Sequence, residues 1–377
     1  MQSPFQFGTL VSGNSFYDRT ESFRELKGYV ESGVNVVFHG PRRYGKSSLV
    51  AKVVDSLNDK EFICITMDLM QVDGLGDFFK IFAQKVVDSR SSTMSFLQKL
   101  LQLIPRLRPT LSFGDDGKPV VSLDIAPEKI TAESVEDLLG MTEKLAESAG
   151  RRVLVVFDEF QEIARFKTRM PFEGVLRSII QRQKNTRYVF LGSQSHLLQR
   201  MFSDATRPFY RAAVPMTIGK PPRVESIQYV QSRMKDVGVR MDSDCASALV
   251  DTADNIPYYI QALALEVHVL KSGTQSPCTL DEVAACWRRI VEQNRVIVEH
   301  SLSTLAEGQR LLLRALAQEP VATFRTAYRK QYGLSSPSSI NSAAKKLKEQ
   351  GHVAQEDGLW RIADPVFSAY LRGICER

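Results

Sequence analysis

Apolar positions in the first 220 residues follow two periods, one typical of buried strands and one typical of helices. Short continuous runs rich in β-branched and aromatic residues predict strands that are covered on both faces. Between these runs, apolar residues recur three or four positions apart, as Phe23, Leu26 and Val30 do, which predicts amphipathic helices. Strands that alternate with helices predict an α/β fold, in which helices cover both faces of a parallel sheet. The runs that we interpret as strands cover residues 34–38, 62–67, 153–157, 188–191 and 213–218.

Two features interrupt this pattern. Pro215 lies in the fifth run and has no backbone N–H, which favours an edge position in the sheet. Residues 105–127 contain two short alternating segments on either side of a Gly-Asp-Asp-Gly turn at 114–117. This arrangement predicts a β-hairpin inserted into the α/β core.

The pattern changes after the proline pair at 221–222. From there to about residue 301 the apolar spacing is helical throughout, and its last helix is predicted over 280–298. From about residue 304, three helical segments precede two short strands, which is the outline of a winged helix-turn-helix. We therefore predict three domains. They are an α/β core over residues 1–222, a helical lid over 223–301 and a winged helix-turn-helix over 302–377.

Composition narrows the class of protein. The 377 residues are 43% hydrophobic, contain no apolar run long enough to span a membrane and begin without a secretory signal, so we expect a cytoplasmic protein with no membrane partner. The five cysteines are scattered without a C-x-x-C pair, which favours reduced thiols over a disulfide framework or a zinc site. The net charge of +6 is a weak indication of an anionic partner.

The strongest chemical signal follows the first strand. Residues 40–47 read GPRRYGKS and match G-x-x-x-x-G-K-[ST] at every fixed position. The glycines allow the loop to curl so that backbone N–H groups converge on a polyphosphate, and the helix that follows adds its positive end. Lys46 can reach the β- and γ-phosphates, and the Ser47 hydroxyl can ligate Mg²⁺. The stretch predicts a nucleoside triphosphate site, formed by Gly40, Pro41, Arg42, Arg43, Tyr44, Gly45, Lys46, Ser47 and Ser48.

Two acids end the third predicted strand, where residues 153–159 read VLVVFDE. In a phosphate-loop fold, an Asp at this place holds the Mg²⁺ shell opposite the loop serine. A following Glu can accept a proton from the attacking water. We assign Asp158 to magnesium and Glu159 to catalysis as the general base, and the alternative is a pair of acids that only caps a helix.

Two further segments are candidates for completing the site. Parallel strands place their carboxyl ends around the ligand, so Ser193 or Gln194, which follow the fourth strand, could contact the γ-phosphate. We choose Ser193 as the candidate. The alternative is that this stretch forms only a simple turn. Arg207 and Arg211 precede the fifth strand, and a guanidinium at the γ-phosphate stabilises the charge of the transition state. Arg211 lies closer to the strand and is our catalytic candidate, with a structural arginine as the alternative.

The third helix of the winged helix-turn-helix would enter the major groove of DNA. Its face opposite Ile340 and Leu347 is polar and basic, and the chain from residue 304 onward carries eleven Lys or Arg against seven Asp or Glu. Phosphate contacts from such residues would give a salt-dependent affinity. Docking to a protein partner is an equally open alternative. The residues predicted to contact DNA are Asn341, Lys345, Lys348 and Arg361.

Four stretches occur in the order seen in a known family. They are FYDRTESFREL at 16–26, HGPRRYGKSSL at 39–49, VVFDEFQEI at 155–163 and PFYRA at 208–212. In these residues the chain resembles the archaeal-type ATPase family, a branch of the STAND NTPases within the AAA+ class. The resemblance extends to ADPVFSAYL at 363–371 and thus covers nearly the whole chain. It implies a P-loop NTPase core of the AAA+ type, a helical lid and a C-terminal winged helix.

The resemblance also implies a ligand and further contacts. ATP or ADP is the expected nucleotide and Mg²⁺ the expected cofactor. The family pattern places Tyr17 and Arg19 near the adenine and strengthens the assignment of Arg211. It also implies that Pro257 of the lid contacts the adenine base, although Asn255 occupies the position where the family has glycine.

Two functions are compatible with these features. The first is an ATPase that hydrolyses ATP with Mg²⁺ and couples the nucleotide state to movement of the lid and winged helix, acting on DNA or on a protein partner. The alternative is a STAND-type switch, in which bound ATP or ADP sets the arrangement of the domains and hydrolysis is slow or depends on a partner. Assembly into a homo-oligomer is compatible with either function, and Arg211 could then act within or between subunits.

Overall fold

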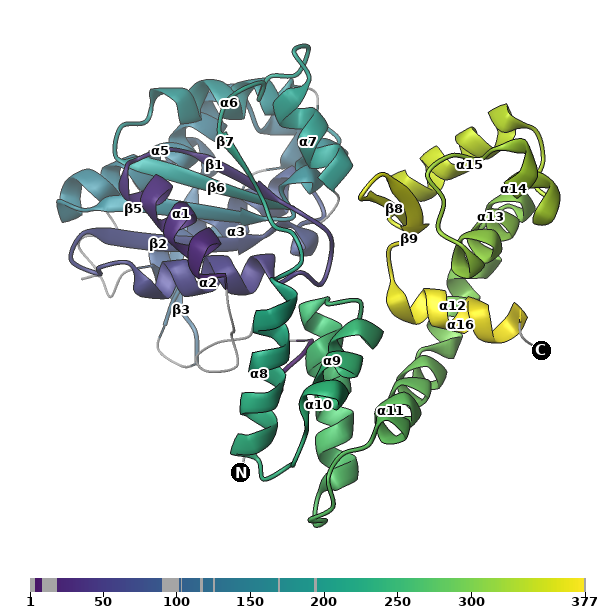
Figure 1. Ribbon diagram of the computed structural model, residues 1–377. Coiled ribbons are helices and arrows are strands. Elements are labelled where there is room, and N and C mark those ends of the chain that lie inside the picture. The colour runs from purple at the N-terminus through teal and green to yellow at the C-terminus, as the bar shows by residue number, and fades with distance from the viewer. Residues whose placement is uncertain are drawn as a thin grey trace. The chain divides into compact units, whose positions relative to one another are not determined.

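The computed structural model divides into two compact units (Figure 1). The first spans Arg19–Gly219, and the second combines Lys220–Arg377 with the N-terminal segment. The structure describes residues 4–8, 19–89, 102, 104–115, 118–124, 126–168, 170–192 and 195–375.

The strands at the centre of the first unit are β1 (Val36–His39), β2 (Phe62–Asp68), β5 (Arg152–Asp158), β6 (Thr186–Gly192) and β7 (Val214–Thr217). They form one sheet in the order β2-β5-β6-β1-β7, and all neighbouring pairs run parallel, which confirms the predicted parallel sheet. β7 lies at an edge, as expected from Pro215. Because the strands are parallel, the carboxyl ends of β1, β5 and β6 lie at the same edge of the sheet.

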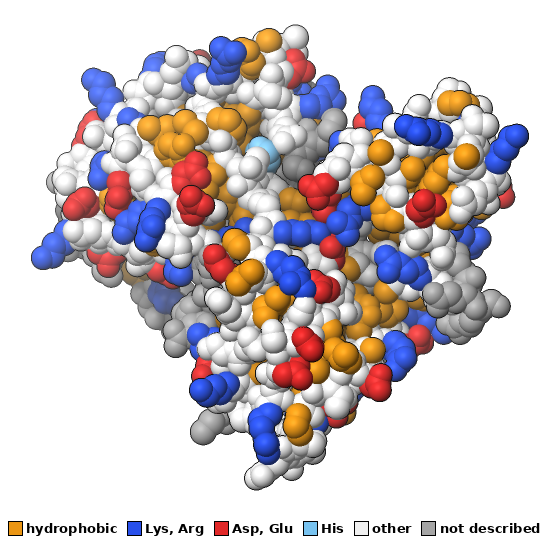
Figure 2. All heavy atoms as spheres, viewed as in Figure 1, with side chains coloured by type: hydrophobic (Ala, Val, Ile, Leu, Met, Phe, Trp, Pro, Cys, Tyr) orange, Lys and Arg blue, Asp and Glu red, His pale blue; other side chains and the backbone are white. Residues whose placement is uncertain are grey.

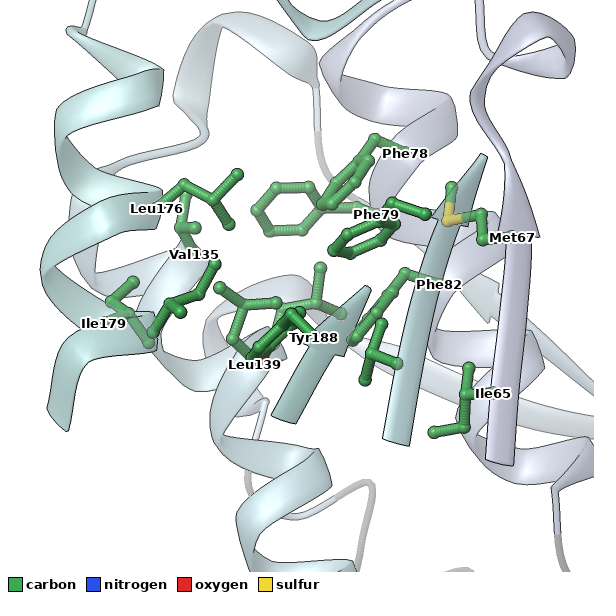
Figure 3. Close-up of a cluster of buried hydrophobic side chains, with 14 of the residues drawn as sticks. Ile65, Met67, Phe78, Phe79, Phe82, Val135, Leu139, Leu176, Ile179 and Tyr188 are labelled. Carbon is green, nitrogen blue, oxygen red and sulfur yellow. The ribbon is translucent and has the colours of Figure 1, made fainter. Parts of the chain in front are cut away.

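The helices in the described part of this unit are α1 (Thr20–Glu31), α2 (Lys46–Ser56), α3 (Leu75–Asp88), α5 (Ala132–Ala149), α6 (Phe172–Arg182) and α7 (Ser195–Ser203). On one face of the sheet, alternate strand residues such as Val153, Val155 and Phe157 join a large apolar cluster with α3, α5 and α6. Figure 3 shows part of this cluster. The intervening Leu154 and Val156 are also buried, so the opposite face is covered as well. The continuous apolar runs in the sequence follow from this burial on both faces.

A hairpin lies within the segment where the sequence predicts one. Its strands β3 (Pro109–Phe113) and β4 (Pro119–Leu123) pair antiparallel. Gln84 of α3 holds β4, because its side-chain oxygen accepts the Val121 N–H at 2.7 Å and its amide donates to the Pro119 carbonyl at 2.9 Å. The hairpin is thus attached to α3 through polar contacts along its second strand.

The second unit contains α8 (Arg223–Asp236), α9 (Ser243–Thr252), α10 (Pro257–Lys271), α11 (Leu280–Gln293), α12 (Arg295–Ser303), α13 (Glu307–Gln318), α14 (Thr326–Gln331), α15 (Pro337–Glu349), β8 (Val353–Glu356), β9 (Leu359–Ile362) and α16 (Pro365–Cys375). The last six elements include three helices followed by an antiparallel two-stranded wing, as predicted. The helix predicted over 280–298 is in fact two helices, because Asn294 interrupts the helical backbone and its side chain donates to the Ile290 carbonyl at 2.8 Å. α16 follows the wing and packs on α13 and α11.

The described N-terminal residues pack on the lid, whereas the sequence pattern predicts that they belong to the α/β core. Phe5 is buried, and the ring of Phe7 meets that of Tyr258 in α10 edge to face, with 5.4 Å between ring centroids. Between these two residues, the backbone N–H of Gln6 donates to the side chain of Gln261. Within the described part of the chain, we find no helix with the length and apolar character that a membrane span requires.

Candidate functional site

The two glycines of the phosphate loop serve different purposes. Gly45 has a φ of 82°, a left-handed conformation that strains any residue with a Cβ. Gly40 is needed for space, since a Cβ there would lie 2.6 Å from Cγ2 of Ile218 and 2.9 Å from the Ile218 carbonyl oxygen. The loop between β1 and α2 therefore packs tightly against the residue that follows β7.

Lys46 lies at the start of α2 and closes the loop on itself. Its Nζ donates to the carbonyl oxygens of Gly40 at 2.9 Å and Pro41 at 2.8 Å. Burial lowers the pKa of Lys46 to about 8, against the carboxylates of Glu159 and Asp158, which raise it. The ammonium group is therefore held inside the loop and faces the acid pair of β5.

Ser47 and Asp158 connect the loop to the acid pair. The Ser47 hydroxyl donates to Oδ2 of Asp158 at 2.7 Å, although the two residues lie 111 positions apart in the chain. The other carboxylate oxygen of Asp158 accepts the backbone N–H of Glu159 at 2.9 Å. Burial raises the pKa of Asp158, while these two hydrogen bonds oppose the shift. The structure thus brings together the residues that we predicted to hold magnesium.

Glu159 follows β5 in a left-handed backbone conformation, with a φ of 51°. Its carboxylate accepts a hydrogen bond from the Gln161 side-chain amide, which belongs to the short 3-10 helix η5 (Phe160–Arg165). The sequence pattern does not single out Gln161, although it lies in the same VVFDEFQEI stretch as the acid pair.

Other predicted nucleotide contacts are distributed between the two units. Arg19 lies beside the loop, where its guanidinium donates to the Tyr44 carbonyl at 3.2 Å. Pro257 is the first residue of α10 in the second unit. Tyr17 and Ser193, predicted to contact the nucleotide, lie outside the described residues.

The backbone conformation just before α10 explains how Asn255 can replace the glycine of the family pattern. It adopts a φ of 52°, and Asn tolerates this left-handed conformation better than most residues. Its side-chain amide donates to the Pro221 carbonyl at 2.7 Å, and its oxygen accepts the Ser226 hydroxyl at 2.7 Å. Asn255 thus adopts the backbone conformation that a glycine would allow and also connects α8 to the chain entering the lid.

The two arginines ahead of β7 differ in their surroundings. Arg207 forms an ion pair with Glu173 at 2.6 Å. Arg211 is exposed, and its guanidinium lies over the Tyr210 ring, 5.1 Å from the centroid. Its backbone N–H donates to the carbonyl of Phe202, near the end of α7.

Arg211 and the phosphate loop lie at opposite ends of the sheet along the strand direction. β1 and β7 are parallel, with Val36 opposite Val214 and His39 opposite Thr217. The loop follows the end of β1, whereas Arg211 precedes the start of β7. The paired residues alone span about 10 Å, at about 3.3 Å per residue. Within one chain, the backbone of Arg211 is therefore remote from Lys46.

The predicted DNA-contact residues occupy two kinds of surroundings. Asn341 and Lys345 are exposed on α15. Lys348 lies over the Trp360 ring of the wing, with its Nζ 5.6 Å from the ring centroid. Figure 2 shows the protein from one side, where Lys and Arg side chains are interspersed with acidic ones.

Arg361 is held by acidic neighbours. It forms ion pairs of 3.0 Å with both Asp254 and Glu356, and Lys220 approaches the same two acids at 2.8 and 3.1 Å. This four-residue cluster connects the wing to the loop that precedes α10. Its members are only partly buried, so each pair contributes little, on the order of 0–1 kcal/mol.

A strand that runs into a G-x-x-x-x-G-K-S loop, with an acid from another parallel strand of the same sheet on the loop serine, defines a P-loop NTPase. The family model of an ATPase domain found predominantly in Archaea matches residues 16–209, which is more than half of the chain. The protein therefore belongs to this ATPase family. A model of a probable winged helix domain matches residues 297–373.

Solved structures share this fold over almost the whole chain. The Walker-type ATPase PABY2304 of Pyrococcus abyssi matches with a TM-score of 0.71 and 18% identity, covering 98% of this chain and 99% of that one. The ORC2 protein of Aeropyrum pernix, in ADPNP–ADP complexes, matches with a TM-score of 0.61 and 13% identity over 99% and 100% of the two chains. The ORC1 protein of the same organism, in complex with DNA, gives a TM-score of 0.50 at 12% identity over 99% and 98%. No curated protein matches the chain significantly.

Proposed function

We propose that this protein binds ATP with Mg²⁺ and hydrolyses it, and that the nucleotide state controls its lid and winged helix. The observation that carries the proposal is the 2.7 Å hydrogen bond between Ser47 and Asp158. It places the phosphate loop, the acid pair and Lys46 in one small region. The family relationship and the nucleotide complexes of a structural neighbour support ATP as the ligand.

The residues at this point suit Mg²⁺. A hydroxyl and a carboxylate are hard oxygen ligands, and Mg²⁺ is usually held by one or two protein groups together with phosphates and water. Asp158 is a partly buried acid whose pKa is raised by burial, so a cation beside it would favour its ionised form. Ser47 and Asp158 would hold the ion, which would neutralise charge on the phosphate oxygens.

The protein groups supply the remaining chemistry. The loop N–H groups and the start of α2 bind the phosphates. Lys46 exchanges its two loop carbonyl partners for phosphate oxygens. Glu159 lies close enough to Lys46 for its charge to raise the Lys46 pKa. It accepts the proton of the attacking water. A phosphate-release assay with ATP, in Mg²⁺ and in EDTA, tests this function. The proposal requires turnover in Mg²⁺ and none in EDTA.

Replacing Gly40 by Ala should abolish ATP binding, because the added carbon displaces Ile218 or the loop itself. Such overpacking also costs about 1–3 kcal/mol of the free energy of unfolding. Gly28→Ala in α1 is the matched control, because its new Cβ meets no atom within 4 Å. Calorimetric titration with ATP and thermal unfolding measure the two effects. ATP affinity at the wild-type level in Gly40→Ala would contradict this account of the loop.

The winged helix is the part of the chain that we propose acts on duplex DNA. Its exposed lysines and the DNA complex of a structural neighbour support this choice over a protein partner. Lys345→Glu with Lys348→Glu should weaken DNA binding and flatten its dependence on salt concentration. Lys60→Glu with Lys80→Glu changes the net charge equally at exposed sites of the first unit and is the control. Fluorescence anisotropy at several salt concentrations measures the DNA affinity of both double variants. Equal affinities for the two would count against DNA as the partner.

A slow switch is the second candidate, and the position of Arg211 favours it. If Arg211 is the residue that contacts the γ-phosphate, a single chain does not bring this arginine to its own site. Hydrolysis would then stay slow until another copy of the chain supplies Arg211. Dependence of the turnover rate per chain on protein concentration distinguishes this mode from an independent enzyme.

A further inference from the structure

A buried amide lies between the acid pair and the end of β6. Gln161 is 1% exposed, and its Nε2 donates to Oε2 of Glu159. The orientation of the amide follows from its partner, because the amide oxygen would be repelled by the carboxylate. Gln161 therefore contacts the proposed general base while being shielded from solvent.

The other end of the amide points at Gly192, the last residue of β6. A Cβ at Gly192 would lie 2.2 Å from Oε1 of Gln161 and 2.9 Å from Cδ2 of Leu198. The backbone of Gly192 is outside the left-handed region, so glycine is needed here for space and not for conformation. The end of β6 thus leaves room for this side chain.

Oε1 of Gln161 is buried and has no hydrogen-bond partner among the residues that the structure describes. A buried acceptor without a partner destabilises the folded state. An apolar side chain of similar size would avoid this cost, because it has no oxygen to leave unpaired. Retaining an amide at a cost in stability is a feature of functional sites.

We propose that Gln161 is a positioning residue that aims the Glu159 carboxylate at the phosphate site. The inference rests on the proposed ATPase function. Its evidence is the hydrogen bond to Glu159, the burial that keeps Gln161 away from substrate, and the space left at Gly192. Because the same amide touches the end of β6, a shift of that strand end also moves Gln161 and, through it, Glu159.

Gln161→Leu tests the inference. We expect kcat to fall about 10- to 100-fold, because misplacing a catalytic group by about 1 Å has an effect of this size. KM and the calorimetric affinity for ATP should stay at wild-type values, and the melting temperature should be equal or higher. Gln183→Leu is the matched control, since Gln183 bonds the Leu139 carbonyl at 2.9 Å and the Tyr188 hydroxyl at 2.6 Å. It should lower the melting temperature and leave kcat unchanged.

Gly192→Ala gives a second route to the same effect, because the added carbon displaces the Gln161 amide without changing any titratable group. In a Glu159→Gln background, neither variant should reduce the rate further, since both act through Glu159. If Gly192→Ala does not fold, Gln161→Leu alone decides.

Two outcomes overturn the inference while leaving the proposed function intact. One is a Gln161→Leu protein with a lower melting temperature and a wild-type kcat, beside a Glu159→Gln protein that has lost turnover. The other is a further fall in turnover when Gln161→Leu or Gly192→Ala is combined with Glu159→Gln. Absence of ATP turnover in the wild type overturns the proposed function itself and this inference with it.

Discussion

Replacement of Glu159 by Gln is expected to slow ATP turnover about 10²–10⁴-fold, the usual contribution of a positioned general base. Binding of ATP should remain close to wild type, because the change is isosteric and the phosphate loop keeps Lys46 and Ser47. Single-turnover measurements with Mg²⁺ separate the rate of hydrolysis from nucleotide affinity.

Glu162→Gln is the control for this experiment, because Glu162 lies in the same stretch and forms an ion pair with Arg165 at 2.7 Å. It should turn over ATP at close to the wild-type rate. Equal rates for wild type and Glu159→Gln would remove Glu159 from the mechanism.

Arg211→Ala is expected to reduce turnover about 10³–10⁵-fold if Arg211 supplies the transition-state guanidinium. Because Arg211 precedes the start of β7 and the phosphate loop follows the end of β1, we expect the arginine to come from a second copy of the chain. A mixture of Arg211→Ala and Glu159→Gln proteins should therefore recover activity, since some interfaces combine an intact arginine with an intact base. ATP affinity of the separate variants should be unchanged.

Arg200→Ala, which removes an exposed arginine of α7, is the control and should retain wild-type turnover. Recovery in the mixture should rise with total protein concentration, because the active interface forms between chains. A mixture no more active than its two inactive components would show that Arg211 does not act in this way.

Much of the fold is predictable because burial determines the residue types of the strands. The run at 153–157 is apolar throughout since both faces of β5 are covered, and Pro215 marks an edge because it lacks an N–H. The break at Asn294 is harder to predict, because Val298 and its neighbours continue the apolar spacing of the helix before it. At the break, both the backbone N–H and the side-chain amide of Asn294 donate to the Ile290 carbonyl.

The same distinction applies to the site. The phosphate loop and the acid pair are visible in the sequence because polyphosphate and a divalent cation demand particular residue types at fixed spacing. The contact of Ser47 with Asp158 then follows from the parallel order of β1 and β5 in one sheet. Gln161 does not follow from any pattern, because its importance depends on the space left by Gly192 in another strand.

Arg361 illustrates a further limit of sequence patterns. Its position in the wing suggests a DNA contact, whereas its acidic neighbour Asp254 lies 107 positions away in the chain. Only the folded arrangement of the second unit shows that this arginine already has partners, which distinguishes it from the exposed Lys345 on α15.

The central claim is that Ser47 and Asp158 hold the same magnesium ion on a bound triphosphate. Calorimetric titration with ATP, in Mg²⁺ and in EDTA, tests it on the wild type, Ser47→Ala, Asp158→Asn and the double variant. We predict that Mg²⁺ strengthens ATP binding to the wild type, that each single variant loses this gain, and that the double variant loses no more than either one. A wild-type protein without ATP affinity, or losses that add in the double variant, would contradict the claim.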